Sequence, residues 1–143
     1  MNLSLTTEYS LRILSFMAMR NEDIHSAEFL YQQLKIPRRY LRRLLTDLSK
    51  AGFLAATRGR NGGFVFARDM NKIYLSEIID TMEGTTGGNR CILGFSFCVV
   101  GKPCVMHDQW TDALGKITDV LKKTSLGVLR DQYSRDSKIE NKE

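Results

Sequence analysis

Three cysteines in the second half of the chain have the side chains best suited to chemistry. Six residues separate Cys91 from Cys98, five separate Cys98 from Cys104, and His107 follows after two more. This spacing differs from the paired two-residue knuckles that are typical of structural zinc sites. Three soft thiolates with a nitrogen or oxygen ligand nearby favour an iron–sulfur cluster instead.

The same cysteines allow other interpretations. A free cysteine is often a small buried hydrophobe, but these three lie in residues 84–105, which contain five glycines and a proline. Such a composition predicts an irregular loop, and unstructured loops of this length usually carry function. A zinc site or a thiol-based redox switch on the loop remains an alternative. His107 is alternatively a helix-capping or surface histidine.

The elements before this loop follow from apolar spacing and from capping residues. Residues 7–19 predict a first helix with Thr6 or Thr7 as its N-cap, and Ser26 is placed to cap a second helix. Pro37 suits the first position of a third helix, which Gly52 ends. Three short helices are therefore expected.

A hairpin and a fourth helix come next. Residues 53–58 and 64–68 predict two strands around residues 59–63, where glycines and Asn61 permit the positive φ angles of a tight turn. Residues 75–83 predict the fourth helix. A helix, a turn, a helix and a hairpin with a basic tip together predict a winged helix-turn-helix.

The predicted fold class is mainly α with a small β-hairpin, and a long C-terminal helix follows the winged domain. That helix, from Met106 to Lys123, carries Trp110, Leu114, Ile117 and Leu121 at helical spacing and is long enough to pair with a copy of itself. The expected divisions are a DNA-binding domain (1–84), a cluster-binding loop (85–105), a dimerisation helix region (106–130) and a flexible tail (131–143).

Charge is distributed unevenly between the two halves. Residues 1–72 hold 12 Lys and Arg against 6 Asp and Glu, and residues 73–143 hold 9 against 10, so the halves carry +6 and −1. This asymmetry favours nucleic acid as the partner of the first half, since no long basic amphipathic segment predicts a lipid surface. No leader-like start and no apolar run of the roughly 18–20 residues that span a bilayer are found. The expected compartment is the cytoplasm.

The third predicted helix carries a cluster of arginines opposite its leucines, with no carboxylate evident to pair with them. Arginine binds guanine edges or phosphates bidentately, and a recognition helix places such residues in the major groove. The bland alternative is a solvated charged face, but the basic wing and the helix-turn-helix spacing favour double-stranded DNA. The candidate DNA-binding residues are Arg38, Arg39, Tyr40, Arg42, Arg43, Arg58, Arg60 and Asn61.

Several segments in order resemble one family of regulators. The segments are Leu3 to Tyr9, Tyr40-Leu41, Arg58 to Phe64, Arg90-Cys91, Cys104 to His107 with Trp110, and Thr124 to Leu129. Over about residues 1–130 the chain resembles the IscR/NsrR-type iron–sulfur regulators of the Rrf-type family. One departure is the spacing of the first two cysteines, because six residues intervene here where five are common.

The resemblance implies a homodimer on a partly palindromic operator, with a bound cluster that modulates affinity. A 2Fe-2S cluster is favoured over a 4Fe-4S cluster. His107 matches the fourth ligand of the IscR-like branch and is slightly favoured. Glu8 matches the acidic ligand of the NsrR-like branch, where it comes from the partner subunit, although it alternatively complements its own helix N-terminus.

The function expected from these features is transcription regulation, such as repression, in response to redox state, nitric oxide or iron and cluster status. Alternatives are a zinc- or thiol-based regulator with the same DNA-binding mode and a metal-free winged-helix module for protein contacts. The chain shows no catalytic triad, phosphate-binding glycine loop or paired acids in a plausible cleft. It is therefore expected not to be an enzyme and to have no small-molecule substrate.

Overall fold

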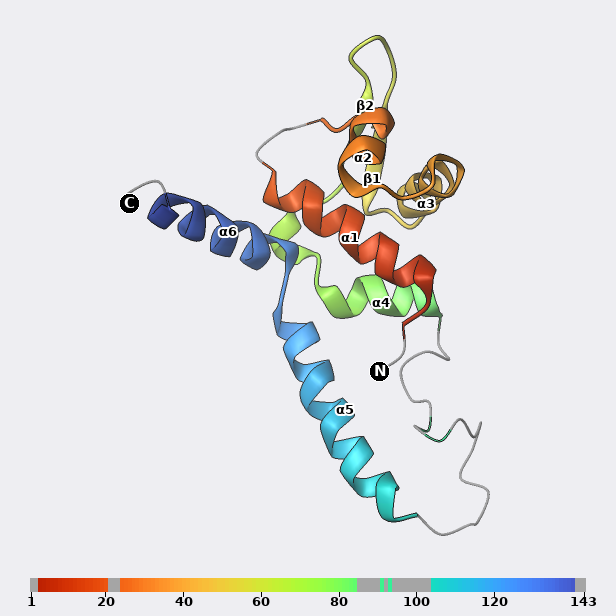
Figure 1. Cartoon of the computed structure of the whole chain (residues 1–143), viewed down its shortest axis with the longest axis vertical. Coiled ribbons are helices and arrows are strands. Elements are labelled where there is room, and N and C mark those ends of the chain that lie inside the picture. Colours follow the sequence, from red (N-terminus) through yellow and green to blue (C-terminus); the bar gives the residue numbers. More distant parts are fainter. Residues whose placement is uncertain (1–2, 21–23, 85–90, 92, 94–103, 141–143) are drawn as a thin grey trace.

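A computed structural model describes residues 3–20, 24–84, 91, 93 and 104–140. Within this part of the chain, the fold is mainly helical with one two-stranded antiparallel hairpin (Figure 1), which confirms the predicted winged helix-turn-helix. The elements in order are α1 (Leu5–Met19), α2 (Ala27–Leu34), α3 (Arg38–Lys50), β1 (Leu54–Thr57), β2 (Gly63–Phe66), the 3₁₀ helix η1 (Met70–Lys72), α4 (Leu75–Glu83), α5 (Val105–Lys123) and α6 (Leu126–Glu140).

Side-chain caps start the first two helices. The Ser4 hydroxyl accepts a hydrogen bond from the Thr7 backbone N–H at 3.2 Å, so α1 begins earlier than predicted and Ser4 is its N-cap instead of Thr6 or Thr7. Ser26 caps α2 as predicted, through the Phe29 N–H at 3.1 Å. Pro37 is the N-cap of α3 instead of its first residue, and its helix has no side-chain cap.

The wing is tied to the segment that precedes α2. Strands β1 and β2 pair in the register Leu54 to Phe66, and the backbones of His25 and Phe64 exchange hydrogen bonds of 3.0 and 2.8 Å. A Cβ added to Gly63 would lie 2.5 Å from the His25 carbonyl oxygen, so this close approach requires glycine. His25 thus anchors the hairpin through its backbone.

The core forms where α1 packs against the other helices. Helices α2, α3, α4 and α6 all contact α1, which runs through the middle of the molecule (Figure 1). Burial of these apolar side chains is the main force that holds the elements together. The fully buried core residues include Ile13, Leu14, Leu30, Ile36, Leu45, Leu48, Ile73, Ile78 and Leu126.

Helix α6 corrects two of the predicted boundaries. Residues 131–140 are helical, where a flexible tail was expected, because the segment after Gly127 has no glycine or proline and a charged surface is compatible with a solvated helix. Residues 125–129 belong with the DNA-binding unit instead of region 106–130, since Leu126 is fully buried and its N–H bonds the Ile73 carbonyl at 2.9 Å. We call α1–α4, the hairpin and the start of α6 the winged domain.

Helix α5 leaves this body and extends away from it (Figure 1), and none of its residues is buried. Its C-terminal end is nevertheless fixed to the winged domain. The Leu75 N–H donates to the Thr124 carbonyl at 2.9 Å, and Tyr74 forms a β-bridge with Ser125. Among the described helices, none is both long enough and apolar enough to cross a bilayer.

Candidate nucleic-acid interface and cysteine site

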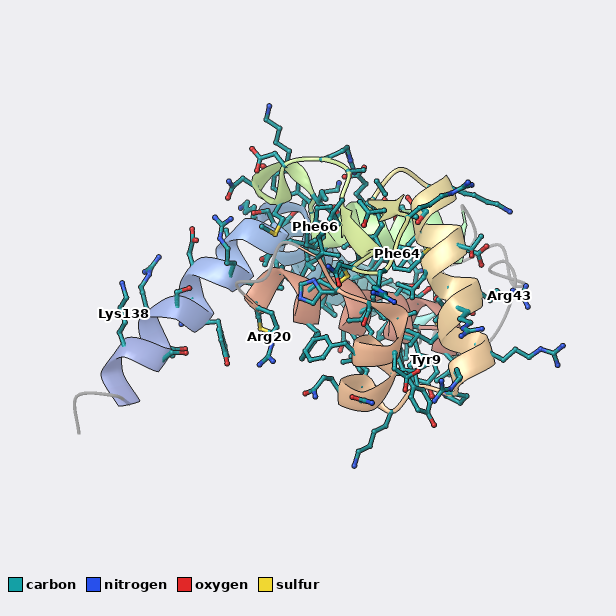
Figure 2. All side chains as sticks on the ribbon, turned by 90° about the horizontal axis from the view of Figure 1, so that it is seen from above. Tyr9, Arg20, Arg43, Phe64, Phe66 and Lys138 are labelled. Carbon is teal, nitrogen blue, oxygen red and sulfur yellow. The ribbon has the colours of Figure 1, made fainter. Side chains whose placement is uncertain are left out.

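Helix α3 separates its apolar and cationic residues onto opposite sides. Leu41, Leu44, Leu45 and Leu48 are buried in the core, whereas Arg39, Arg42 and Arg43 are exposed. Figure 2 shows Arg43 pointing outward from α3, at the opposite end of the molecule from Lys138 on α6. This arrangement leaves a cationic helix face free to meet an acidic surface such as a DNA groove.

The predicted absence of carboxylates near these arginines is corrected at two positions. Arg38 forms an ion pair with Glu28 of α2, and the Arg43 Nε lies 4.0 Å from an Asp47 oxygen, one helical turn along α3. Within the described residues, the guanidinium groups of Arg39 and Arg42 have no ion-pair or hydrogen-bond partner. These two guanidiniums are therefore the most available of the four for DNA.

Tyr40, in the first turn of α3, contacts α1. Its hydroxyl is 2.6 Å from the Thr6 hydroxyl, and its half-buried ring meets the Tyr9 ring edge-on, with centroids 5.5 Å apart. The Arg12 guanidinium lies over the Tyr9 ring, 5.2 Å from its centre. The contact joins residues 34 positions apart, so no local pattern in the sequence predicts it. Tyr40 thus links the first turn of α1 to α3.

The wing presents its polar residues on an exposed turn. Arg58, Arg60 and Asn61 are all exposed, and within the described residues none has a side-chain partner. The turn is closed by the bond from the Gly62 N–H to the Gly59 carbonyl at 3.0 Å. Gly59 has φ +113°, whereas Asn61 has no positive φ, so glycine alone supplies the left-handed residue that the sequence assigned to both.

The structure describes two of the three candidate cysteine ligands. Cys91 is a partly buried free thiol and Cys104 an exposed one at the N-cap of α5, whereas Cys98 lies outside the described residues. The exposed His107 donates its backbone N–H to the Cys104 carbonyl at 3.0 Å, so it follows Cys104 within the first turn of α5. Among the described residues, no group of three metal-binding side chains is assembled.

Glu8 is exposed in the first turn of α1. The Ser4 N–H donates to Glu83 at 2.6 Å, so this turn is tied to the last residue of α4, directly before the cysteine segment begins. Figure 1 shows the start of α5 well away from the start of α1. Within one chain, His107 therefore shares the first turn of α5 with Cys104, whereas Glu8 lies in the first turn of α1.

Comparisons with known proteins agree with this architecture. The model of the Rrf2 family, described as iron-dependent transcriptional regulators, matches residues 3–132. A protein of Aquifex aeolicus that is inferred to be an HTH-type transcriptional regulator is 29% identical over 123 residues, which are 85% of each chain. The HTH-type transcriptional regulator IscR of Xenorhabdus nematophila is 33% identical over 87 residues, 61% of this chain and 52% of that protein.

The fold is also found among solved structures. CymR of Bacillus subtilis, a global cysteine regulator, superposes with a TM-score of 0.77 at 22% identity, covering 92% of this chain and 98% of that one. At this identity the likeness shows the fold alone. The relatives are regulators, which confirms the expectation that the chain is not an enzyme.

Proposed function

Because the chain belongs to the Rrf2 family of transcriptional regulators, we propose that it binds its operator as a homodimer whose DNA affinity is set by an iron–sulfur cluster. The exposed side of α3 enters the major groove, and the wing contacts the adjacent backbone or groove. Support comes from the exposed cationic face of α3 and the basic wing tip on one domain. The proposed DNA-contacting residues are Arg39, Arg42, Arg43, Arg58, Arg60 and Asn61.

Dimerisation occurs through α5 in this proposal. Trp110, Leu114, Ile117 and Leu121 recur along the helix at spacings of four, three and four residues, the pattern of a helix-pairing seam. Ile117 remains 36% exposed and none of the 19 residues of α5 is buried within the chain. Trp110, Leu114 and Leu121 are partly buried within the chain, and a second copy would bury the part of this apolar stripe that stays exposed.

The cluster would be held by Cys91, Cys98 and Cys104. The donor set fits, because the two described cysteines are free thiols and His107 offers an exposed imidazole within a turn of Cys104. We favour His107 as the fourth ligand, and Glu8 of a second copy is the alternative, since the two first turns lie apart within one chain. When bound, the cluster supplies a centre that responds to oxidants, nitric oxide or iron supply.

One observation carries the sensing part of this proposal. Helix α5 has Cys104 and His107 at its first turn, and its other end is fixed to the winged domain through Thr124 and Ser125. A constraint on the first turn of α5 would therefore set the angle between the two winged domains of the proposed dimer. Operator half-sites have a fixed separation, so a change in that angle changes affinity.

A second route to the recognition helix runs through α1. If Glu8 is the ligand, any shift of the first turn of α1 acts directly on α3, because the neighbouring Thr6 and Tyr9 both contact Tyr40. The α5 route requires no such shift. Substitution of Tyr40 by Phe removes the hydroxyl contact with Thr6. It should change the difference in DNA affinity between cluster-loaded and cluster-free protein only if the signal passes through α1.

The proposal is tested with cluster-loaded protein, cluster-free protein and a Cys98→Ala variant on one operator at fixed salt. We expect the loaded form to differ from the other two by about tenfold in affinity, which corresponds to roughly 1.4 kcal/mol. Equal affinities on every natural operator would remove the sensing role.

Anaerobic purification with absorption spectra and iron and sulfide analysis identifies the cofactor. Zinc without sulfide would replace the cluster by a zinc site, and a metal-free protein whose affinity responds to oxidant would indicate a thiol switch.

A further inference from the structure

The first residue of the recognition helix is held by α2. The Arg38 Nη1 and Nη2 atoms donate to the two Glu28 carboxylate oxygens at 2.5 and 3.2 Å, which is a bidentate arrangement. The same guanidinium lies over the Tyr31 ring, with its central carbon 4.3 Å from the ring centre. Both of these partners lie on α2, and the contacts bridge the turn between the two helices.

These contacts act where α3 lacks its usual support. Ser4 and Ser26 cap α1 and α2 with their side chains, but the start of α3 has no side-chain cap. An exposed ion pair alone stabilises little. Two parallel hydrogen bonds and a cation–π contact, however, hold the guanidinium in one place and orient it in a way that a single contact does not.

Arg38 thus differs from the arginines that follow it. Its side chain and that of Glu28 are each 50% exposed, so the positive charge is partly cancelled where α3 would meet DNA. Arg39 and Arg42 are exposed, and their guanidinium groups have no ion-pair or hydrogen-bond partner in the described part of the chain. A contact from Arg38 to a phosphate would bring the Glu28 carboxylate, which is bound to the same guanidinium, close to the negatively charged DNA backbone.

We propose that Arg38 is a positioning residue, which Glu28 and Tyr31 fix so that the recognition helix holds one orientation against α2. It does not contact the operator. Glu28 thereby becomes a specificity-determining residue, because operator sequence is read only when the arginines of α3 are aligned with base edges. This inference rests on the proposed function, namely docking through α3.

The test measures operator and unrelated-duplex affinities over a range of salt concentrations for Arg38→Gln, Arg38→Lys, Glu28→Gln and the double variant with Gln at both positions. We expect each single variant to reduce the ratio of operator to unrelated-duplex affinity by roughly tenfold, with the double variant no worse than either single one. The salt slope for Arg38→Gln should equal that of the native chain, because no phosphate contact is lost.

Arg38→Lys separates positioning from charge. Lysine keeps the positive charge but lacks the planar fork that binds Glu28 bidentately, so we expect it to behave like Arg38→Gln. Native specificity in Arg38→Lys, or a salt slope reduced by about one in Arg38→Gln, would identify a phosphate contact and overturn the inference. Native specificity in Glu28→Gln would overturn it as well.

Arg39→Ala is the control that keeps this inference separate from the proposed function. Weakened binding by Arg39→Ala shows that α3 docks on DNA, and the Arg38 and Glu28 variants then decide the inference alone. If Arg39→Ala and all of the Arg38 variants bind like the native chain, docking through α3 itself is wrong. Circular dichroism melting of each variant confirms that the winged domain is folded.

Discussion

The helices of the winged domain bury their apolar faces within a single chain, whereas α5 buries none of its residues. Leu14, Leu45 and Leu126, from three different helices, all have no exposed surface. On α5, Val120 remains 63% exposed although the helix is 19 residues long. The winged domain therefore buries its apolar faces within the chain, whereas α5 leaves apolar side chains exposed, as the proposed dimer requires.

This difference assigns separate tasks to the two regions. The winged domain holds the cationic α3 face and the wing in fixed positions, which recognition of a DNA groove requires. Helix α5 carries Cys104 and His107 at one end and joins the winged domain at the other. In the proposed function, the winged domain binds the DNA, and the cysteine end of α5 is where a bound cluster would change the DNA affinity.

The largest expected effect is the loss of stability caused by creating a cavity in the core of the winged domain. Leu45→Ala should lower the free energy of unfolding by about 2–5 kcal/mol, because Leu45 is fully buried in the core. Denaturant unfolding measures the change. The matched variant Leu114→Ala on α5, studied at a dilution where sedimentation shows monomer, should cost less than about 1 kcal/mol. Similar losses in both variants would mean that α5 is part of the same core.

Next in size is a charge placed on the α5 stripe. Ile117→Glu should raise the dissociation constant of the proposed dimer by about a hundredfold, since a carboxylate without a partner would be taken out of water. Sedimentation velocity measures this shift. Lys116→Glu on the same helix changes the charge by more but lies off the stripe, so it should leave the dimer intact. A native chain that is monomeric at micromolar concentration would contradict the arrangement.

Much of the winged domain could be predicted because its patterns are local. The leucines of α3 recur at helical spacing, and all four prove to be buried. Gly52, with φ +84°, follows the end of this helix as expected. Both features depend on neighbours within a few residues, and local spacing and turn residues therefore identify them.

The features that could not be predicted join distant segments. Leu126 completes the core from beyond α5, and Glu28 pairs with Arg38 across a turn, although sequence spacing gives no sign of either contact. The charged residues after Asp131 led to a predicted tail, because charge patterning alone does not distinguish a solvated helix from a disordered end. Cys98 and most of the cysteine segment lie outside the described residues, so the ligand set stays a prediction.

A third set of variants tests whether the proposed DNA-binding surface lies on the winged domain alone. Arg39→Ala and Arg42→Ala should each weaken operator binding by about 1–3 kcal/mol, because each removes a guanidinium from the groove-facing side of α3. Arg60→Ala on the wing should lower affinity and flatten the salt dependence, as expected for a phosphate contact. Fluorescence anisotropy over a salt series measures both quantities.

Arg135→Ala on α6 is the control for this set, since it removes the same charge from an exposed helix at the other end of the molecule. It should leave operator affinity close to native. Native binding by the Arg39, Arg42 and Arg60 variants together would show that this surface does not dock on DNA. A loss in Arg135→Ala as large as theirs would show that only total charge matters.

The smallest expected effect is that of Gly115→Ala on α5, which is compared with the same substitution of a glycine in the winged domain. A Cβ added to Gly115 of α5 meets nothing within 4 Å in the single chain, whereas one added to Gly127 of α6 meets the Asn71 side chain and lies 3.0 Å from its Cα. Gly115→Ala should therefore stabilise the monomer by about 0.5–1 kcal/mol through helix propensity. Gly127→Ala should destabilise it by about 1–3 kcal/mol through overpacking against η1. Thermal melting at a dilution that gives monomer measures both.

If Gly115→Ala stabilises the monomer but weakens the dimer, a second copy approaches α5 closely at this position, which places Gly115 inside the proposed interface. If it stabilises both forms equally, the helices pair on another face of α5. Destabilisation of the dilute monomer would contradict the open surroundings of Gly115 and, with them, the contrast between the two regions.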